Sequence, residues 1–297
     1  MRLRDIAAGL ALLASAPAAS ASSSFVERQV AVSPEVTLHL IEAGGVDSKA
    51  PIVFIPGWSA GADIWSGQIE RFAGTRRVIA FDPRSQGEST KTTSGNTPEQ
   101  RAVDLHNLLA AEHVQRPVLV GWSQAAQDVA AYAERYGTRE LAGIVLVDAA
   151  VSDGAKGIAT RPGDAAMQFS RFSTYVTDQH AYLKGMFGAI ISKPQPAGTV
   201  EGAIATAMKT PPSTGIAMLV ADMFGTDRMA ALAKMDCPVL IIAAASSGEL
   251  ARQKSEAKAI RNARFVEIPD SAHAVFLDQP DRFAAALTDF LKQIDAR

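Results

Sequence analysis

Gly121-Trp122-Ser123-Gln124-Ala125 follows the apolar run at 117–120 and leads into a helix-forming stretch at 126–136. A serine on such a sharp strand-to-helix turn has strained backbone geometry and an exposed hydroxyl. Small residues two before and two after the serine avoid collision between the strand and the helix, and Gly121 and Ala125 meet that need. The pattern predicts that Ser123 is a nucleophile at the carboxyl end of a buried strand.

Apolar runs alternate with amphipathic helices along the rest of the chain, which predicts an α/β fold with a mostly parallel central sheet covered on both faces. One intervening helix begins at Thr97, with Pro98 in the first turn, and the final helix begins near Pro280. The predicted strands are Val36–Leu40, Ile52–Ile55, Val78–Phe81, Val118–Val120, Ile144–Val147, Val239–Ile242 and Phe265–Ile268.

The strand rhythm stops between residues 152 and 226. All methionines except Met1 lie between Met167 and Met235, interspersed with aromatic residues. Flexible thioethers and aromatic rings suit an adaptable apolar surface over a pocket, although they also suit the core of the segment itself. We therefore expect a helical lid at 152–226, inserted after the sixth strand into a core formed by 22–151 and 227–297.

The N-terminus has the pattern of a secretory signal peptide. A basic start, Met1-Arg2-Leu3-Arg4, precedes a short apolar core and the small-residue site Ala19-Ser20-Ala21. The apolar core is too short to span a bilayer, which takes about 20 residues. We expect residues 1–21 to be removed and the protein to be periplasmic or secreted.

The overall charge and the cysteine content narrow the classes of function. The formal net charge of -2 gives no electrostatic reason to expect a nucleic acid or an anionic membrane surface as a partner. The single cysteine, Cys237, lies in an apolar context, where it is expected to be a small core residue. We expect a small-molecule substrate and no membrane span.

Two further stretches supply partners for a serine nucleophile. The run at 52–55 ends in Pro56-Gly57-Trp58-Ser59, a tight turn that can direct the Trp58 N–H toward a bound carbonyl. With the Gln124 N–H it would form an oxyanion hole. At the other end of the chain, His273 follows a strand and a loop, where an imidazole can act as general base toward Ser123.

Together these blocks resemble the α/β-hydrolase superfamily, and most of all its branch of cofactor-free haloperoxidases, perhydrolases and small serine esterases. The resemblance rests on the turn at 56–58, Asp82-Pro83-Arg84-Ser85-Gln86-Gly87-Glu88-Ser89, the turn at 121–125 and Ala272-His273-Ala274-Val275-Phe276. It covers the chain outside the signal peptide and the expected lid. Ile55 stands where the branch usually has His, and Ala125 stands where it usually has Gly.

The position of the acid departs from the family pattern. The resemblance implies an aspartate after the seventh strand, where this chain has Ser246 and Ser247. Two carboxylates remain as candidates for orienting His273: Asp148, at the end of the sixth strand, and Glu249, slightly beyond the usual position. Both satisfy the chain order serine, acid, histidine. Each has another explanation, since Asp148 can cap a helix and Glu249 can be a solvated residue.

The predicted chemistry is acyl transfer through a Ser-His-acid triad. We expect hydrolysis of carboxylic esters or lactones with an apolar part, through an acyl-enzyme on Ser123. The sequence has no H-E-x-x-H, P-loop or dinucleotide glycine pattern, so no metal or cofactor is expected. Perhydrolase or haloperoxidase chemistry and carbon–carbon bond hydrolysis are alternatives within the fold. A ligand-binding protein with little turnover is the alternative outside catalysis.

Overall fold

The computed structural model describes residues 25–45 and 49–297, so the predicted signal peptide lies outside the described residues. These residues form one eight-stranded sheet in the order β1-β2-β4-β3-β5-β6-β7-β8. The strands are β1 (Val26–Ser33), β2 (Val36–Ala43), β3 (Ile52–Ile55), β4 (Val78–Phe81), β5 (Val118–Trp122), β6 (Gly143–Val147), β7 (Val239–Ala244) and β8 (Ala263–Ile268).

The sheet is mostly parallel, as the sequence predicts. From β4 to β8 every neighbouring pair is parallel, whereas β2 pairs antiparallel with both β1 and β4. The sequence analysis missed β1, because its outer half is polar and exposed and gives no continuous apolar run. Its alternating Val30 and Val32 are the signal that could have revealed an edge strand.

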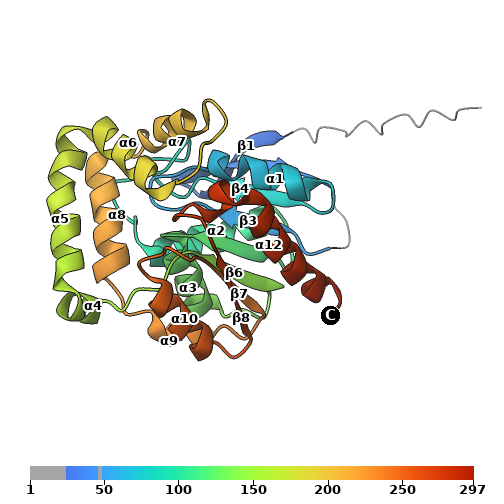
Figure 1. Ribbon diagram of the computed structural model, residues 1–297. Helices are drawn as coiled ribbons and strands as arrows, with labels where there is room; N and C mark the ends of the chain where they lie inside the picture. The colour runs from blue at the N-terminus through green and yellow to red at the C-terminus, as the bar shows by residue number, and fades with distance from the viewer. Residues whose placement is uncertain (1–24, 46–48) are drawn as a thin grey trace, which may run out of the picture.

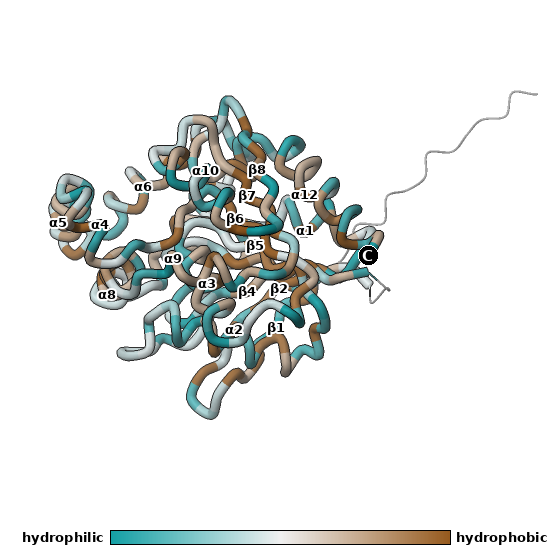
Figure 2. Tube along the Cα trace, turned by 90° about the horizontal axis from the view of Figure 1, so that it is seen from below, coloured by the Kyte–Doolittle hydropathy of each residue, from teal (hydrophilic) through white to brown (hydrophobic). Residues whose placement is uncertain are grey.

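Helices cover both faces of the sheet (Figure 1). Alternate strand residues point to opposite faces, so Phe54 packs with one set of helices and Val53 with the other. The first face carries α1 (Ser66–Ala73) and α12 (Pro280–Asp295), and the second carries α2 (Pro98–Ala111), α3 (Ala125–Tyr136), α9 (Met229–Leu232) and α10 (Leu250–Ala259). In Figure 2 the hydrophobic strands lie between helices with mixed hydropathy.

Of the six helices between β6 and β7, all but α9 lie within the segment where the strand rhythm stops. They are α4 (Ala155–Thr160), α5 (Pro162–Thr177), α6 (Gln179–Ile190), α7 (Thr199–Ala207) and α8 (Pro212–Phe224). We call residues 152–226 the insertion. Figure 1 shows α5 and α8 side by side at the edge of the molecule, away from α12. The buried side chains of Tyr175, Phe187 and Met218 join the insertion to the core on the α1 face.

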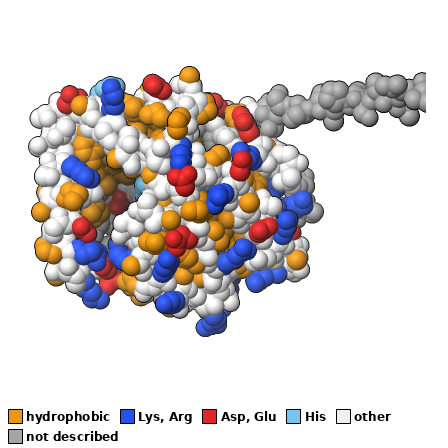
Figure 3. Space-filling model, viewed as in Figure 1, with side chains coloured by type: hydrophobic (Ala, Val, Ile, Leu, Met, Phe, Trp, Pro, Cys, Tyr) orange, Lys and Arg blue, Asp and Glu red, His pale blue; other side chains and the backbone are white. Residues whose placement is uncertain are grey.

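The insertion and the sheet enclose a hollow that is visible in Figure 3. The carboxyl ends of parallel strands meet at one edge of a sheet, and in open α/β sheets ligands bind beyond that edge. Here β5 and β6 end at Trp122 and Val147, directly before Ser123 and Asp148. The fold therefore brings residues far apart in the sequence to the same hollow.

Candidate active site

Ser123 lies on the turn between β5 and α3 with a φ of +57°, in the left-handed region that side chains rarely adopt. Its N–H donates to the carbonyl oxygen of Val147, at 3.1 Å, which holds the strained turn. A Cβ at Gly121 would lie 3.0 Å from the carbonyl oxygen of Ala125, so the strand and the helix approach too closely for a larger residue there. The local sequence is thus matched to a serine that projects from the end of the strand.

His273 contacts both Ser123 and Asp148. Its Nε2 lies 2.8 Å from Ser123 Oγ, and its Nδ1 lies 2.8 Å from Asp148 Oδ2. A carboxylate only accepts hydrogen bonds, so Nδ1 carries a proton and Nε2 is free to accept the hydroxyl proton of Ser123. The side chain of His273 is 31% exposed and that of Asp148 only 1% exposed. The chain of contacts therefore runs from a buried acid to a hydroxyl facing the hollow.

The loop that carries His273 is held on two sides. Trp122 Nε1 donates to the carbonyl oxygen of His273, at 3.0 Å. Asp278, in α11 (Val275–Asp278), accepts from the N–H of Ala272 at 2.7 Å and from the N–H of Ser192 at 2.9 Å. These bonds fix the imidazole relative to both β5 and the insertion.

Asp148 has a full set of hydrogen-bond donors. Its Oδ1 accepts from the N–H of Ala244 at 3.0 Å and from Gln253 Nε2 at 3.3 Å, while Oδ2 is used by His273. Gln253 is fully buried and also donates to Ser247 Oγ, at 3.0 Å. Sequence reasoning missed Gln253, because a glutamine in a polar helix carries no motif. These bonds orient the carboxylate toward His273.

Glu249, the other candidate acid, is bound elsewhere. Its Oε2 accepts from the N–H of Ala150 at 3.1 Å, and its Oε1 accepts from Arg252 Nη1 at 2.6 Å. Ser246, at the position where the resemblance implies an acid, donates to the carbonyl oxygen of Ser271 at 2.7 Å. Glu249 thus supports the loop after Asp148, and the structure brings Asp148 rather than Glu249 to the imidazole.

The turn at 56–59 approaches Ser123 closely. A Cβ at Gly57 would lie 2.9 Å from Ser123 Cβ and 3.4 Å from Ser123 Oγ. Gln86 is fully buried, and its Nε2 donates to the carbonyl oxygens of Gly57 at 3.1 Å and Ala60 at 2.7 Å. Within the described ranges, the backbone N–H groups of Trp58 and Gln124 donate to no protein acceptor. Both amides are therefore free to donate to a bound ligand.

A buried ionic network joins the turn that contains Ser123 to the insertion. Arg101 in α2 donates to Asp128 of α3 at 2.9 Å and to Asp222 of α8 at 2.6 Å. The second oxygen of Asp222 accepts from the side-chain amide of Gln124, the residue after Ser123. Burial raises the pKa of Asp222, and the charge of Arg101 opposes that shift. No motif in the sequence signals this network, because its charged members lie on three separate helices.

A pocket of about 290 Å³ opens over Ser123 and His273. One part of its wall is apolar, in agreement with the expectation from the insertion's composition. The apolar lining residues are Trp58, Ala149, Ala150, Val151, Ala165, Leu219, Met223 and Phe224. Of the methionines expected near the site, Met223 lines this pocket, whereas Met218 is fully buried in the core.

The remaining wall of the same pocket is polar and contains many charged residues. No pattern in the sequence had predicted these charges. Its charged residues besides Asp222 are Asp153, Arg161, Asp164, Glu249 and Arg252. They come from the start of the insertion and from α10, segments about 90 residues apart in the sequence. The pocket wall thus combines charged residues with the apolar surface expected from the composition of the insertion.

The described residues lack two features that would point to other functions. Within 25–45 and 49–297, no group of three or more His, Cys, Asp or Glu side chains is arranged to hold a metal ion. Over the same ranges, no helix is both long and apolar enough to cross a membrane.

Comparison with known proteins shows which proteins this chain is similar to. The profile of the alpha/beta hydrolase family matches residues 52–286. A Synechocystis sp. protein assigned as a non-heme chloroperoxidase is 27% identical over 262 residues, which cover 82% of this chain and 91% of that protein. A bifunctional esterase/perhydrolase of Acinetobacter calcoaceticus is 34% identical over 102 residues, 34% of this chain and 37% of that protein.

Solved structures show the same fold. The crystal structure of a bromoperoxidase from Bacillus anthracis has a TM-score of 0.80 at 23% identity, covering 90% of this chain and 100% of that chain. An esterase from a Rhodococcus species has a TM-score of 0.75 at 22% identity, covering 90% of this chain and 99% of that chain. At these identities the likeness establishes the architecture.

Proposed function

Because the chain belongs to the alpha/beta hydrolase family, we propose that it hydrolyses carboxylic esters or lactones through an acyl-enzyme on Ser123. The observation that carries the proposal is the continuous set of contacts from Ser123 through His273 to Asp148, each 2.8 Å long. The base lies within hydrogen-bonding distance of both the nucleophile and the orienting acid, as the chemistry requires.

In the first half-reaction, Ser123 Oγ attacks the ester carbonyl carbon while His273 Nε2 takes its proton. The Asp148 carboxylate stabilises the imidazolium through Nδ1. The N–H groups of Trp58 and Gln124 donate to the oxyanion of the tetrahedral intermediate. The bond from carbonyl carbon to alkoxy oxygen then breaks, and His273 delivers its proton to the leaving alcohol.

The second half-reaction replaces the alcohol with water. His273 removes a proton from water, whose oxygen attacks the acyl carbon, and the acid leaves as Ser123 recovers its proton. We also propose that the insertion at 152–226 acts as a lid over this site and that residues 1–21 direct export. The apolar wall of the pocket supports a substrate with an apolar part.

The first test is hydrolysis of a p-nitrophenyl ester series of increasing acyl length by the wild type and by Ser123→Ala. We expect turnover by the wild type and none above background by the variant. A fluorophosphonate should also add its mass to a peptide containing Ser123. A wild type that neither turns over any ester nor reacts with the phosphonate would support the ligand-binding alternative.

Perhydrolysis is a second candidate, favoured by the matches to haloperoxidases and to an esterase/perhydrolase. In that reaction hydrogen peroxide takes the place of water in the second half-reaction and a peracid leaves. Adding peroxide and acetate to the wild type, with a monochlorodimedone bromination readout and Ser123→Ala as control, measures it. Peracid formation that is lost in the variant would add this activity to the ester hydrolysis.

A further inference from the structure

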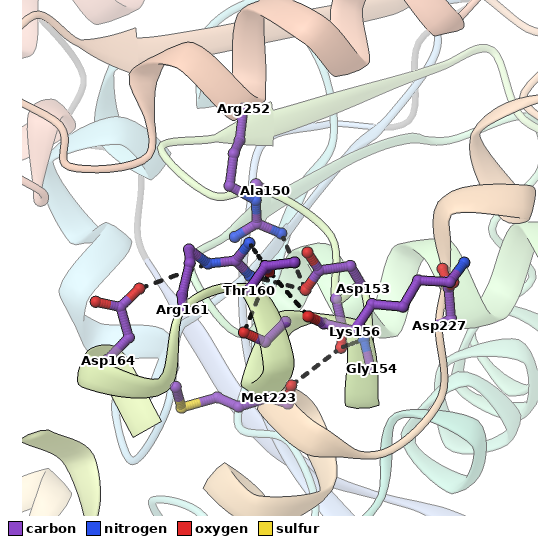
Figure 4. Close-up of polar contacts among 12 residues, drawn as sticks. Ala150, Asp153, Gly154, Lys156, Thr160, Arg161, Asp164, Met223, Asp227 and Arg252 are labelled. Carbon is purple, nitrogen blue, oxygen red and sulfur yellow. Dashed lines mark hydrogen bonds and ion pairs between the residues drawn. The ribbon is translucent and has the colours of Figure 1, made fainter. Parts of the chain in front are cut away.

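Two arginines lie on the wall of the pocket that also contains Ser123 and His273. Arg161 comes from the junction of α4 and α5 in the insertion, and Arg252 comes from α10 in the core. Figure 4 shows their guanidinium groups converging on Asp153 from different elements. Neither residue takes part in the proposed triad or in the proposed oxyanion hole, so both are available for a different task.

The guanidinium of Arg161 has unused hydrogen-bonding capacity. Its Nη2 donates to Asp153 Oδ1 at 2.8 Å. Its other contacts are long, 3.4 Å from Nη1 to Thr160 Oγ1 and 3.5 Å from Nε to Asp164 Oδ2. A guanidinium has five N–H donors, so most of those on Arg161 lack a close protein acceptor. The group is charged, 35% exposed and faces the pocket.

Arg252 is more fully occupied and brings a second positive charge to the same carboxylate. It donates to Glu249 at 2.6 Å and to the carbonyl oxygen of Val151 at 2.7 Å, and its Nη2 lies 3.8 Å from Asp153 Oδ1. The hydrogen bond from Arg161 lowers the pKa of Asp153, which therefore stays ionised. At the centre of the cluster, two guanidinium groups share one carboxylate.

With the two outer carboxylates, Asp164 and Glu249, the cluster has a slightly negative formal charge. Both carboxylates are more exposed than the arginines. The side chains of Asp164 and Glu249 are 66% and 45% exposed, compared with 28% for Arg252. Exposed ion pairs are weak, so a ligand can displace Asp164 from Arg161 at little cost. A carboxylate that binds a guanidinium through two parallel hydrogen bonds gains more than such a pair loses.

Gly157 makes room for this arrangement. A Cβ at that position would lie 2.3 Å from Asp153 Oδ1 and 2.8 Å from Arg161 Nη2. A methyl group there would displace the ends of both side chains, so glycine at this position allows the ion pair to keep its geometry.

We propose that Arg161, assisted by Arg252, binds a carboxylate of the substrate, so that the preferred substrates are esters or lactones that carry a free carboxylate, such as half-esters of dicarboxylic acids. This inference rests on the proposed ester hydrolysis. The apolar wall would contact the methylene chain between the two carboxyl groups. Such a substrate has the apolar part expected from the sequence and, in addition, an anionic end.

The test compares monoethyl dicarboxylates of increasing chain length with the ethyl esters of the matching monocarboxylic acids, followed by pH-stat titration. We expect wild-type kcat/KM to favour the half-ester by about 10- to 100-fold at the best chain length, the factor given by hydrogen bonds to charged groups. In Arg161→Gln that ratio should fall toward one, mainly through KM. The control is Lys156→Gln, whose side chain is 79% exposed, pairs with Asp227 and does not line the pocket.

Gly157→Ala provides a second perturbation, which should reduce the same ratio while Arg161 is still present. Thermal unfolding of each variant identifies any that are misfolded. A wild type that prefers the neutral ester, or an Arg161→Gln variant that keeps the wild-type ratio, would overturn the inference. A preference for esters bearing an amine would also overturn it, because the carboxylates would then be the binding groups.

A binding measurement separates this inference from the proposed function. Calorimetric titration of Ser123→Ala with the dicarboxylate product needs no turnover, and binding should weaken at least tenfold when Arg161→Gln is added. Ser123-dependent hydrolysis of neutral esters without dicarboxylate binding would refute the subsite and leave the proposed function standing. Dicarboxylate binding without turnover of any ester would refute the hydrolysis and leave the subsite.

Discussion

Asp148→Asn preserves the size of the side chain and changes one hydrogen-bonding atom. The Ala244 N–H, 3.0 Å from Oδ1, is a fixed backbone donor and requires an oxygen at that position. The asparagine NH₂ group must then face His273 Nδ1, which has to become an acceptor. The imidazole proton moves to Nε2, where it faces Ser123 Oγ and prevents the ring from acting as base.

The expected loss follows from that tautomer change. In serine proteases the equivalent substitution lowers turnover by about four orders of magnitude, which corresponds to about 5.5 kcal/mol in the activation free energy. A flipped asparagine would avoid the wrong tautomer but would place its NH₂ against the Ala244 N–H. With Asp148 only 1% exposed, water cannot relieve that contact.

The assay is kcat/KM on the best ester of the series, with Glu249→Gln as the matched carboxylate-to-amide control. The side-chain amide in that control keeps an oxygen for the Ala150 N–H, so we expect its activity to stay within about tenfold of the wild type. Thermal unfolding of both variants checks that they are folded. A larger loss in Glu249→Gln than in Asp148→Asn would refute the assignment of the acid.

Three further perturbations test other parts of the structure. Gly57→Ala should lower kcat by about a hundredfold or more, since its Cβ would lie 2.9 Å from Ser123 Cβ and displace the nucleophile; unchanged kinetics would contradict the close approach. Asp222→Asn and Asp128→Asn should both lower the free energy of unfolding by about 3–5 kcal/mol, because each breaks a pair with the buried guanidinium they share. Only Asp222→Asn should also lower kcat, and equal kinetics in the two variants would show that the contact from Asp222 to the nucleophile turn is without effect. Burial raises the pKa of Glu256 from 4.5 to about 8, so between pH 4.5 and about 8 the unfolded state binds fewer protons than the folded state. As the pH rises through this range, the free energy of unfolding falls by up to about 1.4 kcal/mol per pH unit. Glu256→Gln should remove that slope in urea denaturation, and an unaltered slope would rule out this carboxyl as its source.

Much of the fold could be read from local patterns. A parallel strand buried on both faces is a continuous apolar run, so the sequence predicts β3 (Ile52–Ile55) and β4 (Val78–Phe81) with the bounds that the structure has. The turn at Ser123 is equally local, because steric strain between adjacent strand and helix constrains residues two positions away. The edge strand β1 has weaker constraints on its exposed face, and its pattern was not recognised.

The sequence by itself determined the α/β architecture and the tight turn at Ser123, because both depend on packing between neighbours in the chain. The tertiary structure alone decided which carboxylate meets His273, since Asp148 and Glu249 follow adjacent strands and differ in the direction of their side chains. It also placed Arg161 beside Arg252 in the pocket. These contacts join segments that are far apart in the sequence. Their distance in space depends on how the whole sheet and the insertion fold, which no local sequence pattern encodes.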